Sequence, residues 1–572
     1  MRLRKLSKRM KSKANILKSF FVFDTETTKL EPMPKNFVFG VIYGYNFHKV
    51  IYTVNDFKKE FTKNKYKGKT IFAHNAEFDL LTIYGNIYTS LDSKAIFNGK
   101  FIMAKNNDVT FADSLNILLQ SVAKIGEKLG VNKLDNEKVK TQKLTKKNIT
   151  SEDINYCIMD CRIVYDSLAK IFIEIGAVKM TLAAISLYIF RKHYLSTELY
   201  YSEYVYDFYE SYYGGRTEAF QLGKTNSIVY DLNSLYPYVM ENMNFPDISK
   251  LSRYEGNDLK YLDFCLKRFE GMAKVDVYHK KTYFGYLPYR GENNLLFPVG
   301  NFTTTVNFNE LRFALKAGVI EVTKVYYIVS ANPVKSPFTK FVNDNYRKRF
   351  ESDNDFDKFF YKIILNSLYG KFAQKKKYQD EYYNQIPYEL ISELQKTGDF
   401  YKLNRFSEER EDCYLTTINK KQENSFFAIP TYSSYITSQA RITLLQGLID
   451  NKDQKVTYCD TDSIFLEKKF KGNIGNNLGQ WKLEDKKCLE INGLKNYVYL
   501  EDGIIKEAIK GISKNAVKVG KGKYHIKKYF KTKEALRRNE EAGKSFTMVK
   551  NLTHEYNKRQ VIKNKFTLPL EL

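Results

Sequence analysis

Short hydrophobic runs that end in acidic residues recur along this chain. The run at 20–23 (Phe-Phe-Val-Phe) leads into Asp24 and Glu26, and the run at 70–73 (Thr-Ile-Phe-Ala) is followed by a segment that contains Asp79. Such runs predict buried β-strands, and side chains two residues apart on a strand point the same way. Asp24 and Glu26 are therefore expected to face one metal site, with Asp79 delivered by the second strand.

A helix with an apolar stripe is predicted to supply one more acid. Apolar residues recur every three or four positions from Ile154 to Leu168, and Thr150 or Ser151 can cap the start of this helix. Tyr156 and Asp160 are four residues apart, so they are neighbours on one face. Four acids from two strand ends and a helix are what two-metal phosphodiester hydrolysis requires. They are Asp24, Glu26, Asp79 and Asp160, and Tyr156 would orient the attacking water.

A second group of acids is predicted in the other half of the chain. A strand-like run at 227–230 ends at Asp231, and two β-forming runs flank Asp460 and Asp462 in the segment Tyr458-Cys459-Asp460-Thr461-Asp462-Ser463. Two carboxylates on a tight turn repel each other unless a divalent cation neutralises them, and Mg²⁺ or Mn²⁺ suits oxygen ligands. An isolated Asp-x-Asp is more often a solvated acidic turn, so the interpretation depends on the accompanying segments.

The helix predicted at 359–372 carries polar residues on a face that also bears a tyrosine. Lys362, Asn366 and Tyr369 stand at positions i, i+4 and i+7, which places them on one side. The resemblance of this segment to motif B of family B DNA polymerases implies that Lys362 binds a triphosphate and that Asn366 and Tyr369 pack on a nascent base pair. Arg349, in the basic segment 346–349, is expected to supply a second triphosphate cation.

Three further segments are candidates for DNA contact. In Tyr212-Tyr213-Gly214-Gly215-Arg216, paired glycines let the backbone approach a phosphate chain closely, although a plain turn is the alternative. A helix is predicted to open at 437–441, where Arg441 is expected to hold template or primer backbone. The Lys-rich stretch 501–572 is suited to follow duplex phosphates.

Composition supports a polyanionic partner. Lys and Arg outnumber Asp and Glu by 92 to 65 in 572 residues, which gives a net charge of +27, and such a surplus favours nucleic acid. An aromatic content of 15% also suits base stacking, although a biased genome would raise the lysine content as well. The six scattered cysteines form no zinc set and indicate a cytosolic, non-secreted protein. No run is long enough to predict a membrane span.

The N-terminal acids resemble the three motifs of DEDD-superfamily 3′–5′ exonucleases in their tyrosine-containing form. The matching segments are Asp24-x-Glu26, Asn75-x-x-Phe78-Asp79 and Tyr156-x-x-x-Asp160, in this order. The resemblance implies that Asn75, Phe78, Ser114 and Leu115 hold a frayed 3′ end, although Ser114 is equally well explained as an ordinary turn residue.

The later segments resemble the motifs of family B DNA polymerases. Asp231 to Pro237 is similar to motif A, Lys362 to Gly370 to motif B, Tyr458 to Ser463 to motif C, and Lys495-Asn496-Tyr497 to the Lys-x-Tyr motif. The resemblance implies that Asp231 and Asp462 hold two catalytic ions with support from Asp460. It also implies that backbone amides from Leu232 onward meet the triphosphate, that the Tyr236 ring excludes a 2′-hydroxyl, and that Lys495 and Tyr497 grip the primer terminus. Tyr212, Gly214 and Gly215 match the Tyr-x-Gly-Gly segment.

The order of these motifs resembles protein-primed family B DNA polymerases of small linear-genome bacteriophages and plasmids. The implied fold is α/β and α+β multidomain, with an RNase H-like 3′–5′ exonuclease domain followed by a right-hand (palm, fingers, thumb) polymerase domain with two insertions. The expected divisions are the exonuclease at 1–178, linker and first palm part at 179–250, insertion 1 at 251–335, fingers at 336–373, insertion 2 at 374–424, second palm part at 425–500 and thumb at 501–572.

The same resemblance implies cofactors and partners. Each active site would take two Mg²⁺ ions, with Mn²⁺ possible, and the substrates would be dNTPs, primer-template and single-stranded DNA. A terminal protein that contacts insertion 1 would prime synthesis, and insertion 2 would give processivity and strand displacement. We expect a monomer in the cytoplasm of a host cell, with no membrane partner. A conventionally primed repair or viral polymerase, a nuclease with an inactive polymerase half and a non-enzymatic DNA-binding coat remain the alternatives.

Overall fold

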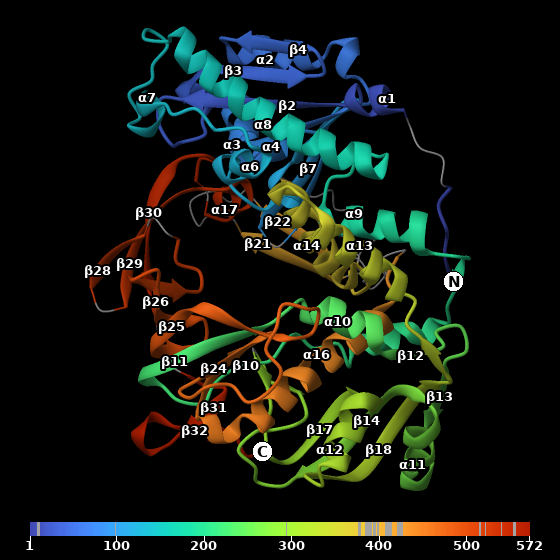
Figure 1. Cartoon of the computed structure of the whole chain (residues 1–572). Helices are drawn as coiled ribbons and strands as arrows, with labels where there is room; N and C mark the ends of the chain where they lie inside the picture. Colours follow the sequence, from blue (N-terminus) through green and yellow to red (C-terminus); the bar gives the residue numbers. More distant parts are fainter. Residues whose placement is uncertain are drawn as a thin grey trace.

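In the computed structural model the chain forms an N-terminal domain, a central sheet and the segments that connect them (Figure 1). The N-terminal domain lies at the top of that view, a central sheet lies below it, and the red segment β28–β30 joins the two at the left. The structure describes residues 1–7, 12–97, 99–292, 294–375, 379–383, 392, 396, 400–405, 414–419, 427–513, 516–520, 522–538, 540–552 and 556–572.

The N-terminal domain is a seven-stranded mixed sheet in the order β4-β3-β2-β5-β8-β7-β6. Strands β2, β5 and β8 are parallel, so their carboxyl ends meet at one edge of the sheet. Helix α8 lies across β2 and β3, as Figure 1 shows. It begins with a capping box between Thr150 and Asp153 and ends at Gly176, which has a left-handed backbone. The strands are β2 (Phe20–Thr27), β3 (Phe37–Gly44), β4 (Phe47–Ile51), β5 (Thr70–Ala73), β6 (Ser93–Phe97), β7 (Lys100–Asn106) and β8 (Val109–Asp113); the helices are α1 (Lys13–Leu17), α2 (Val54–Phe61), α3 (Ala76–Tyr84), α4 (Ile87–Ser90), α5 (Leu115–Leu118), α6 (Val122–Leu129), α7 (Glu137–Lys140) and α8 (Ser151–Ile175).

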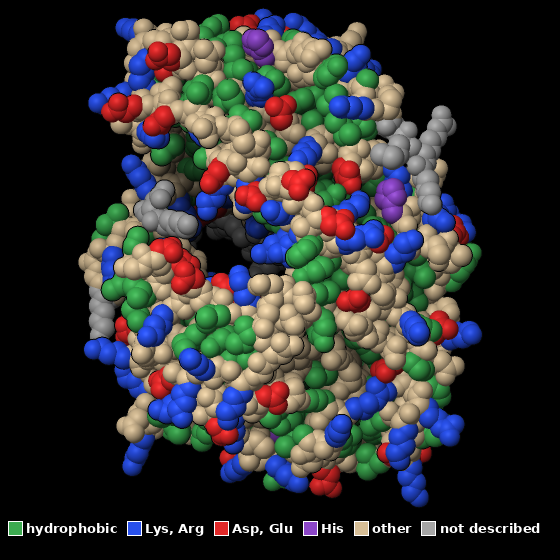
Figure 2. Space-filling model, viewed as in Figure 1, with side chains coloured by type: hydrophobic (Ala, Val, Ile, Leu, Met, Phe, Trp, Pro, Cys, Tyr) green, Lys and Arg blue, Asp and Glu red, His purple; other side chains and the backbone are tan. Residues whose placement is uncertain are grey.

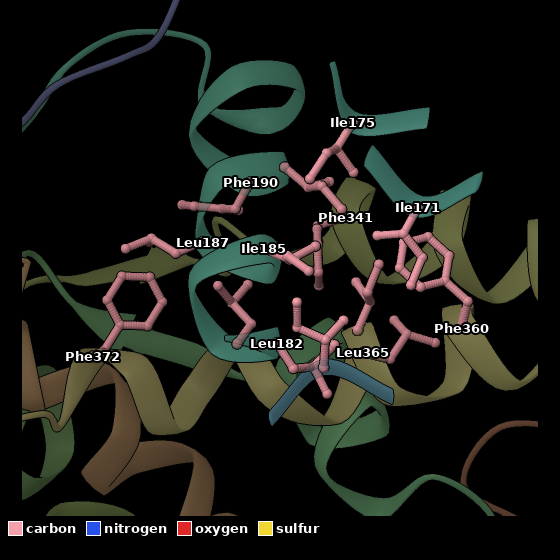
Figure 3. Close-up of a cluster of buried hydrophobic side chains, with 14 of the residues drawn as sticks. Ile171, Ile175, Leu182, Ile185, Leu187, Phe190, Phe341, Phe360, Leu365 and Phe372 are labelled. Carbon is pink, nitrogen blue, oxygen red and sulfur yellow. The ribbon is translucent and has the colours of Figure 1, made fainter. Parts of the chain in front are cut away.

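A continuous apolar cluster joins this domain to the helices that follow. Figure 3 shows α8 residues Ile171 and Ile175 beside residues of the helix that begins at Leu182 and of the two helices predicted as fingers. This packing stabilises the position of the fingers against the N-terminal domain. The helices are α9 (Leu182–Ile189), continued by a π-helical turn (Phe190–Tyr194), α13 (Thr339–Glu351) and α14 (Asp355–Phe372). The predicted helix 359–372 is therefore confirmed, with a start four residues earlier.

The central sheet has seven strands in the order β10-β23-β24-β11-β25-β26-β27. Helices α10 and α16 pack against each other beside it. Helix α16 begins at Pro430, so the helix predicted to open at Thr437 starts two turns earlier. The elements are β10 (Thr217–Ala219), β11 (Gly223–Leu232), α10 (Leu235–Asn242), α16 (Pro430–Asp450), β23 (Val456–Asp460), β24 (Ser463–Leu466), β25 (Trp481–Gly493), β26 (Asn496–Glu501) and β27 (Ile504–Ile509).

The two expected insertions differ in how far the structure describes them. The first forms its own sheet, β13-β18-β14-β17, with α11 and α12 and a separate apolar core. The second, 374–424, lies mostly outside the described residues, apart from the strands β20 (Gln379–Tyr383), β21 (Phe400–Arg405) and β22 (Tyr414–Asn419). The first comprises β13 (Ser252–Glu255), α11 (Leu259–Arg268), β14 (Glu270–His279), β15 (Tyr289–Arg290), β16 (Leu295–Leu296), β17 (Gly300–Asn307), α12 (Phe308–Lys316), β18 (Ile320–Ala331) and β19 (Pro333–Lys335). Strand β19 pairs with β12 (Asn244–Pro246), which precedes the insertion.

The segment predicted as thumb divides among three parts of the molecule. Strand β27 belongs to the central sheet, and β28 (Val517–Gly520), β29 (Lys523–Tyr529) and β30 (Ser545–Asn551) form a sheet of their own. Phe530 and α17 (Thr532–Arg538) pack into the core of the N-terminal domain. Residues 556–572, with β31 (Arg559–Val561) and β32 (Thr567–Pro569), return to the central sheet, where Leu222 donates to the Lys565 carbonyl.

The N-terminal residues are also held by backbone pairing. Strand β1 (Arg2–Leu3) pairs with β9 (Leu199–Tyr200), which lies between the two halves of the chain. None of the helices in the described ranges is both long enough and apolar enough to cross a membrane.

Candidate active sites

The acids of the central sheet meet at the turn between β23 and β24. Asp231 on β11 pairs with Ser463, and the Leu232 amide donates to the Asp462 carbonyl oxygen at 2.7 Å. Thr461 adopts a φ of 62°, which turns the chain sharply between the two acids. The hairpin predicted from sequence is confirmed, and its turn is fixed directly beside the end of β11.

The three carboxylates of this site have different surroundings. Asp460 accepts hydrogen bonds from Thr217 and Thr461 at 3.1 and 3.0 Å, and its Oδ1 is 3.2 Å from Lys495 Nζ. By contrast, among the described residues Asp231 and Asp462 have no hydrogen bond or ion pair with another side chain. These two acids are therefore the ones free to take a cation, and Asp460 supports the turn.

Burial makes the free acids hard to ionise. It raises the pKa of Asp231 to about 7, with further contributions from the charges of Asp462 and Glu484. Burial also raises the pKa of Asp462, helped by the charge of Asp460. Paired carboxylates with raised pKa values fit a divalent cation, which removes both the repulsion and the desolvation penalty. Sequence reasoning missed Glu484, an acid on β25 with no motif around it.

The predicted nucleotide-binding residues converge on this site from α10, α13 and α14. The Tyr236 ring stacks on Tyr369 with centroids 4.5 Å apart, and Arg349 donates to Ser234 Oγ at 3.2 Å. Burial raises the pKa values of Asp231 and Asp462, and the charge of Lys362 opposes this rise.

Asn366 completes this face of α14. Its side chain donates to the Lys362 carbonyl at 2.9 Å, one turn back along the helix. Leu232 is buried, and only its backbone amide faces the turn. Of the six residues predicted to bind the nucleotide, Tyr236 and Tyr369 contact each other and Leu232 lies at the acidic turn through its amide. Arg349, Lys362 and Asn366 lie on the neighbouring helices α13 and α14.

The Tyr-x-Gly-Gly segment packs against the acidic turn. The Thr461 amide donates to the Arg216 carbonyl at 2.7 Å, and a Cβ on Gly215 would lie only 2.9 Å from the Thr461 side chain. Gly215 thus permits a close backbone approach, while Gly214 is exposed with open space around it. Tyr212 is near enough to Tyr369 to raise its pKa.

Arg441 occupies a different environment from the one expected. Its side chain is 3% exposed and forms a bidentate ion pair with Glu310 of α12, at 2.8 and 2.9 Å. It also donates to the carbonyl oxygens of Tyr213 and Gly214. The guanidinium therefore joins insertion 1, α16 and the Tyr-x-Gly-Gly segment, and it does not reach a surface where a phosphate would bind.

The Lys-x-Tyr residues lie behind the acidic turn. The Lys495 amide donates to the Tyr458 hydroxyl at 2.9 Å, and the Tyr497 ring contacts Tyr458 and Phe465. Lys495 also faces Asp460, whereas the Tyr497 ring packs behind the turn.

The second acid cluster lies where the parallel strands of the N-terminal domain end. Asp79 Oδ1 accepts from the Thr25 amide at 3.0 Å and from its hydroxyl at 2.7 Å, which fixes α3 to β2. Burial raises the pKa of Asp24 to about 7, and it raises the pKa values of Glu26 and Asp79 well above their usual range. Such a group of buried acids is suited to hold divalent cations.

Asp160 faces this cluster from α8 and has a cationic partner that sequence reasoning missed. Lys133 Nζ lies 2.5 Å from Asp160 Oδ2 and 4.8 Å from the centre of the Tyr156 ring. Asp160 Oδ1 is buried without a hydrogen bond. Burial, followed by the charge of Asp160, raises the pKa of Tyr156 to about 12, so the phenol stays protonated and can donate to a water. No sequence pattern singles out Lys133, a lysine that follows α6.

The expected 3′-end ligands lie along one side of the cluster. Asn75 has a φ of 74°, and the amides of Asn75 and Leu115 both donate to Asp113 Oδ1 at 2.9 Å. Phe78 meets the ring of Tyr529 from β29 at 5.8 Å. Leu115 is 37% exposed, but Ser114 is fully buried and its hydroxyl is bonded to Ala73 and His74. The alternative of a structural serine therefore describes Ser114 better than a direct contact.

Figure 2 shows a hollow between the N-terminal domain, the β28–β30 segment and the central sheet, with Lys and Arg side chains at its rim. A basic opening of this kind suits a nucleic acid backbone.

Comparison with known proteins assigns the chain to a family. A family model described as DNA polymerase type B, organellar and viral, matches residues 127–469. The chain belongs to this polymerase family. This family B polymerase is 26% identical to the DNA-directed DNA polymerase of Enterobacteria phage PRD1 over 536 residues, which is 89% of this chain and 88% of the phage protein. It is also 29% identical to a probable DNA polymerase of Podospora anserina, over 48% of this chain and 24% of that protein.

Solved structures agree on the fold. The ternary complex of phi29 DNA polymerase with primer-template DNA and incoming nucleotide matches 94% of this polymerase and 99% of that chain, with a TM-score of 0.68 at 16% identity. The expected multidomain fold, with a nuclease-like domain followed by a palm, fingers and thumb, is thereby confirmed. The polymerase is a DNA-directed DNA polymerase, as the family and the phage relative indicate.

Proposed function

We propose that this family B polymerase extends DNA at the Asp231–Asp462 site and degrades it from the 3′ end at the Asp24–Asp160 site. The observation that carries the proposal is the presence of two clusters of buried acids on two different sheets of one chain. A DNA-binding coat would gain nothing from either cluster, and a nuclease would not need the second.

The chain's own residues define the extension reaction. Two Mg²⁺ or Mn²⁺ ions held by Asp231 and Asp462 would stabilise the attacking 3′-oxygen and the leaving pyrophosphate oxygen. Lys362 and Arg349 bind the triphosphate, and the Leu232 region contributes backbone. Tyr236 lies under the sugar, where its ring leaves no room for a 2′-hydroxyl.

Further residues orient the base pair and the DNA strands. Asn366 and Tyr369 pack on the nascent base pair, and Lys495 and Tyr497 hold the primer terminus. Tyr212, Gly214 and Gly215 follow the template backbone. These roles are supported by the stacking of Tyr369 on Tyr236, by the bond from Asn366 to the Lys362 carbonyl, and by the bond from the Lys495 amide to the Tyr458 hydroxyl.

The degradation reaction uses the other cluster. Asp24, Glu26, Asp79 and Asp160 would hold the cations, and bound cations would supply a hydroxide nucleophile and stabilise the leaving oxygen. Tyr156 orients the attacking water and Lys133 holds Asp160 in place. Asn75, Phe78 and Leu115 bind the 3′-terminal nucleotides of a single strand.

The wider setting is proposed from the order of the motifs, which resembles that of protein-primed family B polymerases. We infer a monomer that replicates a linear viral or plasmid genome in the host cytoplasm, primed by a terminal protein bound at insertion 1. Insertion 2 would give processivity and strand displacement. A conventional primer would serve the same active site, so a priming assay with the cognate terminal protein distinguishes the two modes.

One experiment tests both activities. A labelled primer on a single-stranded template is incubated with Mg²⁺, with and without dNTPs. We expect extension with dNTPs and stepwise shortening without them. Asp462→Asn should abolish extension and keep shortening, and Asp24→Ala should do the reverse; equal loss of both activities in either variant would contradict two separate sites.

A further inference from the structure

A thiol stands inside the N-terminal acid cluster, and the mechanism above does not use it. Cys157 is fully buried on α8, next to Tyr156 in the chain. Its Sγ lies 3.7 Å from Asp24 Oδ2 and 3.9 Å from the Asp24 carbonyl oxygen. Ligand atoms of Asp24, Glu26 and Cys157 all lie within 4.8 Å of one another.

Glu26 is the second observation that points to a ligand here. It is 6% exposed, and within the described part of the chain its carboxylate has no hydrogen bond or ion pair. A buried carboxylate without a partner is costly, and a bound cation removes that cost. Because Glu26 faces both Asp24 and Cys157, the cation that satisfies it would also meet the thiol.

The separation of the ligand atoms suits zinc. Zinc lies about 2.3 Å from sulfur and about 2.0–2.2 Å from carboxylate oxygen, so a tetrahedral ion spans about 3.6 Å between one sulfur and one oxygen. The observed distance of 3.7 Å between Cys157 Sγ and Asp24 Oδ2 is close to this value. Sulfur ligands favour zinc over Mg²⁺, whereas carboxylates alone favour Mg²⁺ and Mn²⁺.

We propose that Asp24, Glu26 and Cys157 form a zinc site that competes with the magnesium of the degradation reaction. The thiol gives its proton to solvent as the metal binds. The effect on degradation rests on the proposed exonuclease function, whereas zinc binding itself does not. Zinc then slows shortening of DNA more than it slows extension.

The polymerase site provides an internal contrast. Cys459 precedes Asp460 in the chain, but successive residues of a strand face opposite sides of the sheet. Cys459 packs into an apolar cluster with Leu444 and Ile464, away from the carboxylates. The polymerase site therefore offers oxygen ligands, and its zinc sensitivity should not depend on a cysteine.

The binding test uses the full chain with Co²⁺ as a coloured substitute for zinc. We expect a thiolate-to-cobalt charge-transfer absorption that Zn²⁺ displaces and that Cys157→Ser lacks. Cys161→Ser is the matched control, because Cys161 is equally buried one turn further along α8 and its Sγ contacts the Val41 carbonyl instead. Since outer partners alone change metal affinity about 10- to 100-fold, Cys157→Ser should weaken zinc binding at least about tenfold by calorimetry.

The functional test compares zinc inhibition of shortening, with each variant normalised to its own zinc-free rate. The half-inhibiting zinc concentration should rise at least about tenfold in Cys157→Ser and stay unchanged in Cys161→Ser. Circular dichroism and primer extension show whether each variant is folded. An unchanged cobalt band or zinc affinity in folded Cys157→Ser would overturn the site. Absent shortening in a wild-type protein that shows the band would instead refute the exonuclease proposal alone.

Discussion

Replacement of Arg441 tests whether this residue stabilises the fold or binds a DNA phosphate. The side chain is buried against Glu310, so Arg441→Met leaves a carboxylate in the interior without a partner. Removal of one member of a buried pair typically costs about 3–5 kcal/mol, whereas replacement of both members by apolar residues is often neutral. We therefore expect Arg441→Met to lower the free energy of unfolding by about 3–5 kcal/mol.

The double variant Arg441→Met/Glu310→Leu should recover most of this loss. It still lacks the hydrogen bonds to the carbonyl oxygens of Tyr213 and Gly214, each of which contributes about 0.5–1.5 kcal/mol. A residual deficit of about 1–3 kcal/mol is therefore expected. Recovery of stability in the double variant would identify a buried ion pair. If Arg441 lay on the surface, replacement of Glu310 would not restore the free energy of unfolding.

The chain carries its own probe for this measurement. Trp481 is the single tryptophan, and it packs against α16 so closely that a Cβ on Gly447 would lie 2.6 Å from its ring. Its fluorescence during denaturation reports on the helix that bears Arg441. The same variants are then compared for the salt dependence of DNA binding, in which each phosphate contact contributes a slope of about 0.9.

The two roles predict opposite results. If Arg441 holds the Tyr-x-Gly-Gly segment in place, DNA affinity falls equally at all salt concentrations and the slope is unchanged. A variant Arg441→Met of unaltered stability whose slope falls by about one unit would refute the structural role and restore the phosphate contact expected from sequence.

Three further outcomes are expected. Tyr236→Val should admit ribonucleotides while Tyr236→Phe still excludes them, as measured by incorporation of single rNTPs; equal discrimination in both variants would reject the ring as the barrier. Lys133→Met should slow shortening of single-stranded DNA by about 100-fold or more and leave extension intact, because Asp160 loses the lysine ammonium that holds its carboxylate in place. An unaffected rate of shortening would show that Lys133 has no part in the reaction. Burial raises the pKa of Asp231 from 3.8 to about 7, so the folded metal-free protein keeps a proton that the unfolded chain releases, and stability should fall as pH rises between about 4 and 7. Asp231→Asn should flatten that decline in denaturation experiments with a chelator, and an identical pH profile would contradict it.

The sequence predicted the acids well because their positions follow from local rules. Asp24 and Glu26 end a buried run, and Asp231 ends another, so the strand period itself places them at a sheet edge. The face of α14 was predictable for the same reason, since Lys362, Asn366 and Tyr369 follow the helical period.

The partners of these acids were not predictable from sequence. Lys133 and Glu484 reach the sites by tertiary folding, and a single charged residue without a pattern resembles any solvated side chain. Arg441 was expected to hold template or primer backbone, and its burial was not predictable because its partner Glu310 lies 131 residues earlier, in an insertion with no recognisable chemistry. Burial by a distant segment is invisible to a local pattern.

The attachments of the β28–β30 segment have a mechanical consequence. It is tied to the central sheet through β27 on one side and through residues 556–572 on the other, and Phe530 fastens its middle to the N-terminal domain. A segment that is attached at both ends and in its middle cannot swing outward about a single hinge. A duplex held beside this segment could leave through the side only if the segment detached from the central sheet or from the N-terminal domain. Sliding of the duplex along its own axis would break neither attachment and would therefore meet less resistance.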